Sequence, residues 1–180
     1  MAAPCTEHLF FTGRKGVGKS TLVRTAIEGK RAGGFFTRRV EGVLERPSVH
    51  LLRAGTVDVP SAENLLFCCG GADMQQFDKL GCGALADTAG CEVLVMDELG
   101  PHEEQAAAFR QAVLRALEGD VPVVGVLQQA ESAFLRQVAS HPNVRVVTVT
   151  EENRDALRLW LAQRKGPVDK GSKYVRSVVE

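Results

Sequence analysis

Residues 13–20 read Gly-Arg-Lys-Gly-Val-Gly-Lys-Ser, and this segment is the strongest indication of the fold in the sequence. It fits the pattern G-x-x-x-x-G-K-[ST] at every fixed position. It follows the apolar run Leu9-Phe10-Phe11, and apolar residues continue after it at helical spacing to about Gly29. The sequence therefore predicts a strand, a glycine loop and a helix. Glycines let successive N–H groups point inward, so the loop and the helix N-terminus make a cradle for phosphate.

The side chains of this loop predict contacts with a nucleoside triphosphate. We expect the Lys19 ammonium beside the β and γ phosphates, the Ser20 hydroxyl on Mg²⁺, and the Thr21 hydroxyl near the α phosphate. For the side chains of Arg14 and Lys15, a solvated charge is favoured over a phosphate contact. The residues expected to bind nucleotide in this segment are Gly13, Arg14, Lys15, Gly16, Val17, Gly18, Lys19, Ser20 and Thr21. The alternative, a glycine-rich turn capped by Ser20, is disfavoured because the strand and the helix both accompany the loop.

A pair of acids, Asp97 and Glu98, follows a second apolar run that begins at Cys91. That run has the pattern of a central parallel strand covered on both faces, so both acids are expected at its carboxyl end, beside the phosphate loop. Asp97 is the predicted Mg²⁺ ligand, and Glu98 is predicted to orient or deprotonate the attacking water. Glu103 and Glu104 fall in the first turn of the next helix, where they are expected to cap that helix.

Strands alternate with helices along most of the chain, which is typical of an α/β protein with a doubly wound, mostly parallel sheet and helices on both faces. One domain is expected over residues 1–165, and the role of the tail, residues 166–180, is not readable. The expected strands are 9–11, 35–40, 49–53, 91–97, 121–127 and 144–149. The expected helices are 19–29, 74–89, 102–117, 131–139 and 152–163.

Composition gives no indication of a nucleic-acid-binding, membrane-spanning or disulfide-rich protein. The 180 residues carry 22 basic and 22 acidic side chains, so the bulk charge gives no indication of nucleic acid or of an acidic membrane surface. No apolar run reaches membrane-spanning length and the start resembles no leader, which predicts a soluble cytoplasmic protein. Five cysteines without a C-x-x-C pair are expected to be free thiols, and the four scattered histidines indicate no metal site.

Four segments in this order resemble the THEP1 family of nucleoside-triphosphatases, also called cancer-related NTPases. The segments are Gly13 to Thr21, Gly34-Phe35-Phe36-Thr37, Asp97-Glu98-Leu99-Gly100 and Thr150-Glu151-Glu152-Asn153-Arg154-Asp155. The resemblance implies a P-loop α/β fold and slow, Mg²⁺-dependent hydrolysis of nucleoside triphosphates with broad base tolerance. It also makes Asn153 and Arg154 candidates for the base-side wall of the pocket, although both residues could instead cap a helix and pair locally.

The sequence departs from that family where Arg38 and Arg39 stand after Gly34-Phe35-Phe36-Thr37, a position at which the family usually carries acids. These arginines either lie on a solvated strand edge or face the site, where one would bind a phosphate of a second substrate or act as an internal arginine finger. Hydrolysis of nucleoside triphosphates by Lys19 and Glu98 is the leading hypothesis. A kinase acting on a nucleotide or other small molecule is the second, and a non-catalytic nucleotide-binding module is the third. A guanine-specific switch is least favoured because no [NT]-K-x-D motif is present.

Overall fold

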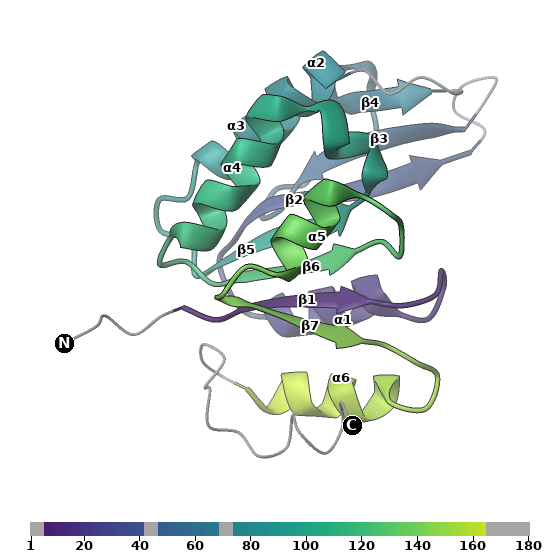
Figure 1. Ribbon diagram of the computed structural model, residues 1–180, viewed down its shortest axis with the longest axis vertical. Helices are drawn as coiled ribbons and strands as arrows, with labels where there is room; N and C mark the ends of the chain where they lie inside the picture. The colour runs from purple at the N-terminus through teal and green to yellow at the C-terminus, as the bar shows by residue number, and fades with distance from the viewer. Residues whose placement is uncertain (1–5, 42–46, 69–73, 165–180) are drawn as a thin grey trace.

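The computed structural model describes residues 6–41, 47–68 and 74–164, and these ranges form a sheet with helices on both of its faces (Figure 1). Within them the sheet has seven strands in the order β4-β3-β2-β5-β6-β1-β7. The strands are β1 (His8–Thr12), β2 (Ala32–Val40), β3 (Ser48–Arg53), β4 (Leu65–Cys68), β5 (Val93–Leu99), β6 (Val123–Leu127) and β7 (Val144–Thr148). Strands β2, β5, β6, β1 and β7 run parallel, whereas β3 and β4 add an antiparallel edge.

Two sets of helices cover the sheet. The helices are α1 (Lys19–Ile27), α2 (Met74–Gln76), α3 (Cys82–Ala86), α4 (Ala107–Glu118), α5 (Ala133–Ala139) and α6 (Arg154–Gln163). Short turns of other helix types are η1 (Ala62–Asn64), η2 (Phe77–Gly81) and η3 (Pro101–Gln105). Helices α1 and α6 pack on one face, and α3, α4 and α5 pack on the other (Figure 1). The predicted doubly wound, mostly parallel α/β fold is confirmed.

Alternate residues of the central strands supply the two cores. In β1, Leu9 and Phe11 point into the cluster with α1 and α6, whereas Phe10 points into the cluster with α3, α4 and α5. Because a strand turns successive side chains to opposite faces, a strand covered on both faces must be apolar at every position. The unbroken apolar runs of the sequence therefore locate the strands that lie at the centre of the sheet.

The helix predicted over residues 74–89 is confirmed from Met74 to Ala86, where α2, the π-helical segment η2 and α3 follow one another without a gap, and it ends three residues earlier than predicted. Gly81 lies against the aromatic ring of Phe109 in α4, and a Cβ at Gly81 would come within 2.2 Å of that ring. Glycine thus permits the close approach of η2 and α4. Helix propensity, which depends on the local sequence, contains no information on this contact.

The helix predicted from His102 is interrupted. Residues Pro101–Gln105 form η3, and α4 begins only after Ala106, which is buried and has a ψ of 83°. The strand β4 (Leu65–Cys68) falls within residues 54–75, for which the sequence indicates loops and short strands without defined bounds. The tail 166–180 lies outside the described residues. Cys82 and Cys91 are free thiols, and Cys5 and Cys69 lie outside the described residues.

The parallel arrangement brings the carboxyl ends of five strands to one edge of the sheet. The glycine loop follows β1 there, Asp97 and Glu98 lie near the end of β5, Gln128 follows β6, and Thr150 follows β7. In open α/β sheets ligands bind in the crevice at this edge. No helix within the described ranges is long and apolar enough to cross a membrane.

Candidate functional site

The glycine loop joins β1 to α1 in a conformation that three glycines make possible. Gly13, Gly16 and Gly18 have φ angles of 140°, 80° and 107°, a region that side-chain-bearing residues rarely adopt. A Cβ at Gly13 would lie 2.5 Å from the carbonyl oxygen of Val149, so the loop also packs directly against the chain that follows β7. Val17 is buried and anchors the loop to the core.

Lys19 lies across this loop. Its Nζ donates hydrogen bonds of 2.8 Å to the carbonyl oxygens of Gly13 and Arg14, which keeps the ammonium over the mouth of the loop. The side chains of Arg14 and Lys15 are exposed, as the preferred interpretation of the sequence required. Thr21 is exposed in the first turn of α1, and its contact with the α phosphate stays a prediction.

Ser20 and Asp97 meet although 77 positions separate them in the sequence: the Ser20 Oγ donates to Asp97 Oδ1 at 3.2 Å. Asp97 is 5% exposed, and burial raises its pKa to about 6, with the charge of Glu98 adding to the effect. The bond from Ser20 and the charges of Arg24 and Lys19 oppose that rise. A buried carboxylate beside a hydroxyl therefore lies next to the phosphate loop.

The donor set of Ser20 and Asp97 fits Mg²⁺. A hydroxyl and a carboxylate are hard oxygen ligands, and Mg²⁺ is usually held by one or two such groups together with substrate phosphates and water. Among the described residues no group of three or more His, Cys, Asp or Glu side chains could hold a metal ion. The described residues therefore form no metal site made entirely of protein ligands. They are compatible with a Mg²⁺ site in which Ser20, Asp97 and the phosphates of the nucleotide share the metal.

Glu98 is held at two points. Its backbone N–H donates to Thr37 Oγ1 at 3.2 Å, and its carboxylate oxygen Oε1 accepts a hydrogen bond from Gln128 Nε2. The peptide bond between Asp97 and Glu98 is cis. Glu103 lies nearby and is 4% exposed; burial raises its pKa to about 8, and the charge of Glu98 contributes in the same direction. Its Oε2 accepts from the Gly100 N–H at 3.0 Å, which confirms that Glu103 caps its own turn.

Asn153 and Arg154, the two candidates for the base-side wall of the pocket, have different contacts at the start of α6. The Asn153 side chain accepts from the Thr150 N–H at 2.8 Å and donates to the Thr148 carbonyl at 2.9 Å, so it braces the turn after β7. The next residue, Arg154, places its Cδ 4.0 Å from where a Cβ at Gly18 would lie. Arg154 therefore lies beside the phosphate loop, whereas the Asn153 side chain forms hydrogen bonds within its own turn.

A family model described as "NTPase" matches residues 8–161 of this sequence. The chain belongs to this NTPase family. The nucleoside-triphosphatase THEP1 of Methanosarcina barkeri is 34% identical over 85% of this chain and 94% of that protein. The THEP1 of Thermofilum pendens is 30% identical over 87% of this chain and 94% of its own length. The resemblance expected from the four sequence segments is confirmed.

Solved structures support the same grouping. The solution structure of a human cancer-related nucleoside triphosphatase has a TM-score of 0.62 with 28% identity, covering 88% of this chain and all of that one. The crystal structure of THEP1 from Aquifex aeolicus also has a TM-score of 0.62, and its 24% identity supports the fold alone. The fold of the NTPase family therefore extends over nearly all of the described residues.

Arg38 and Arg39 point to opposite faces of β2. Phe36 packs with the cluster beneath α1, so by alternation Arg38 lies on the face that carries the phosphate loop. Arg39 faces the other way and pairs with Glu41 at 3.5 Å. Phe36 is the register partner of Asp97, and the Arg24 guanidinium of α1 lies 5.8 Å from the Phe36 ring. Of the two, Arg38 is thus on the face of the sheet that α1 covers.

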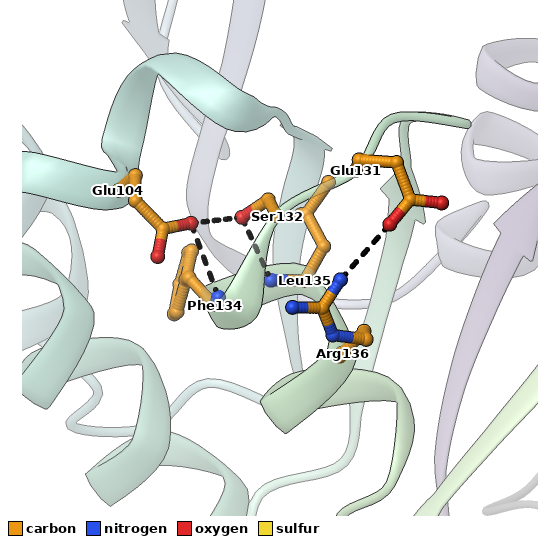
Figure 2. Close-up of polar contacts among 6 residues, drawn as sticks. All are labelled: Glu104, Glu131, Ser132, Phe134, Leu135 and Arg136. Carbon is orange, nitrogen blue, oxygen red and sulfur yellow. Dashed lines mark hydrogen bonds and ion pairs between the residues drawn. The ribbon is translucent and has the colours of Figure 1, made fainter.

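Glu104 does not cap its own helix, and that prediction is wrong. Figure 2 shows its carboxylate reaching the start of α5, where Oε2 accepts from the Ser132 hydroxyl and from the Phe134 N–H. These bonds, with that from Ser132 first, lower the pKa of Glu104. The Ser132 Oγ in turn accepts from the Leu135 N–H at 3.2 Å, so hydroxyl and carboxylate together cap α5.

Sequence reasoning missed three residues of this NTPase site: Thr37, Gln128 and Arg24. Thr37 stood in a segment already noted for its family resemblance, and its position next to β5 follows once β2 is paired with β5 in parallel. Arg24 stands four positions after Ser20, which places both on one side of α1. Gln128 follows the apolar run of β6, and a polar residue at a strand end was the signal available.

Proposed function

We propose that this chain binds a nucleoside triphosphate with Mg²⁺ at the glycine loop and hydrolyses it to the diphosphate and phosphate. The observation that carries the proposal is the hydrogen bond between Ser20 and Asp97, because it joins the loop to the acidic strand end in a single site. Membership of the NTPase family and the names of the THEP1 relatives support the same activity.

Each residue has a distinct task in this proposal. Ser20 and Asp97 would hold Mg²⁺, which when bound supplies positive charge to the phosphate oxygens. The Lys19 ammonium and the loop N–H groups stabilise the negative charge that grows on the leaving phosphate oxygen. Arg154, beside Gly18, contacts the nucleotide from the α6 side.

Glu98 acts on the water. Its carboxylate orients a water molecule toward the γ phosphorus and accepts the proton as the oxygen–phosphorus bond forms and the bond to the bridging oxygen breaks. A transfer to another acceptor is the second candidate, and the observation in its favour is the exposed Arg38 on the loop side of β2. Domain bounds of 1–165 and a cytoplasmic location remain predictions from the sequence.

Phosphate release from MgATP and MgGTP tests this proposal. The wild type is expected to release phosphate without any added acceptor, and Lys19→Ala is expected to lose nucleotide binding and release together. Lys79→Ala is the control, since Lys79 is an exposed lysine of η2, outside the glycine loop, and is expected to behave as the wild type. Binding without release would favour the non-catalytic module. Formation of the diphosphate only with an added acceptor, without free phosphate, would favour the kinase.

A further inference from the structure

We propose that Gln128 is a positioning residue that fixes the Glu98 carboxylate for attack by water, an inference that rests on the proposed hydrolysis. The Gln128 Nε2 donates to Glu98 Oε1. An ionised carboxylate only accepts hydrogen bonds, so the amide must present its nitrogen to Glu98. One carboxylate oxygen is then engaged with Gln128, and the Oε2 oxygen is left to receive the proton of the water.

The backbone explains why Gln128 lies within reach of Glu98. Parallel strands β5 and β6 end side by side, and the Gln128 N–H donates to the Leu99 carbonyl at 2.9 Å. That bond continues the ladder by one residue beyond β6. The side chain of Gln128 therefore starts from a backbone position that is fixed to the same strand as Glu98.

Gly100 provides the space for the amide. A Cβ at Gly100 would lie 2.9 Å from the Gln128 Cδ and 3.0 Å from both of its amide atoms. Gly100 has a φ of −132° and a ψ of −175°, angles that any residue can adopt. The glycine is thus explained by the close approach of the Gln128 side chain and not by its backbone conformation.

The segment that carries Gln128 is held at its other end as well. It runs from β6 to α5, and the bonds from Ser132 and Phe134 to Glu104 tie the start of α5 to η3 (Figure 2). Three residues lie between the two attachments, at Gln128 and Ser132. Such a short connection between fixed ends restricts where the Gln128 amide can move.

Glu98 is restrained from the opposite side by Thr37, whose hydroxyl accepts from its backbone N–H. Thr37 therefore fixes the main chain of Glu98, and Gln128 fixes its carboxylate. Groups that must act within a few tenths of an ångström depend on such supporting bonds. Loss of the amide donor should lower the rate of the chemical step more than it lowers nucleotide binding.

Steady-state kinetics with MgATP test the inference in two variants of Gln128 and one control. Gln128→Met keeps the approximate volume without the amide, and its kcat should fall about tenfold to a hundredfold with KM nearly unchanged, as expected for losing one bond to a charged group. Gln128→Glu places a second carboxylate beside Glu98 and should lower kcat at least as much. Gln129→Met is the matched control, because Gln129 is exposed and adjacent. Its kcat and KM should equal those of the wild type.

Gly100→Ala provides an independent perturbation that leaves Gln128 in the sequence. The added methyl displaces the amide, so kcat should fall about tenfold while the melting temperature changes little, because the far end of a flexible side chain can move aside. Unchanged kcat in Gly100→Ala and in both Gln128 variants would overturn the inference.

A double-mutant cycle with Glu98→Gln distinguishes positioning from a general loss of structure. If Gln128 acts through Glu98, Gln128→Met should have little further effect on kcat in the Glu98→Gln background. A full additive loss would overturn the positioning role. A normal rate for Glu98→Gln alone would instead overturn the proposed role of Glu98. Slow Glu98→Gln together with normal Gln128→Met would overturn only the present inference.

Discussion

Replacing Glu103 by Gln should change how the stability of this protein depends on pH. The Glu103 side chain is 4% exposed, and burial raises its pKa from an ordinary value of 4.5 to about 8. Between these two values the folded protein keeps a proton that the unfolded chain has released. The unfolded state therefore binds fewer protons, and the free energy of unfolding falls as the pH rises.

The expected size follows from this difference of one bound proton. The contribution of Glu103 falls by up to about 1.4 kcal/mol for each pH unit, so it declines by roughly 2–3 kcal/mol between pH 5 and pH 7. Glutamine carries no proton to lose, and its amide oxygen can still accept from the Gly100 N–H. The stability of Glu103→Gln relative to the wild type should therefore increase steadily over the same interval.

Urea unfolding at pH 5, 6 and 7 measures this difference directly, with the midpoint and the slope determined at each pH. Glu118→Gln is the matched control, since Glu118 is exposed at the end of α4, and its difference from the wild type should stay constant with pH. A constant difference for Glu103→Gln as well would refute the reasoning. It would mean that Glu103 is ionised in the folded protein at neutral pH.

Four further predictions concern other parts of the molecule. Gly34→Ala should destabilise the fold by about 3 kcal/mol or more in urea unfolding, because its φ is 87° and a Cβ would lie 2.1 Å from the Val95 carbonyl oxygen. Excess EDTA should abolish phosphate release, and Asp97→Asn should raise the Mg²⁺ concentration for half-maximal release about tenfold or more. Arg154→Ala should raise KM for MgATP about threefold to tenfold with a smaller change in kcat. Burial lowers the pKa of His8, so stability should fall below pH 6.5 as the unfolded chain takes up a proton, and it should fall less in His8→Gln.

The glycine loop and Asp97 could be predicted from short stretches of consecutive residues. The glycine loop needs its residue types at fixed spacing, because its backbone must turn around a phosphate. Asp97 could be assigned because an acid after a buried run stands at a strand end, and parallel strands share that edge. The contact between Ser20 and Asp97 was predictable as proximity, although its distance of 3.2 Å was not.

Residues joined by packing were not predictable in the same way. Gln128 contacts Glu98 only because β6 lies next to β5, and a sequence does not state the order of strands. Glu104 lies where an acid is expected to cap its own helix, yet its carboxylate accepts a hydrogen bond from the Phe134 N–H at the start of α5. Gly81 lies inside a predicted helix, where glycine only lowers helix propensity, and the reason for a glycine there is a tertiary contact with Phe109.

The central claim is that Glu98 activates water for attack on a nucleotide held by the glycine loop. The most direct test is single-turnover phosphate release from MgATP by the wild type and by Glu98→Gln, with nucleotide affinity measured on the same samples. Glu98→Gln is expected to bind MgATP as tightly as the wild type and to release phosphate about a hundredfold to ten-thousandfold more slowly. Equal rates of release in the two proteins would contradict this expectation.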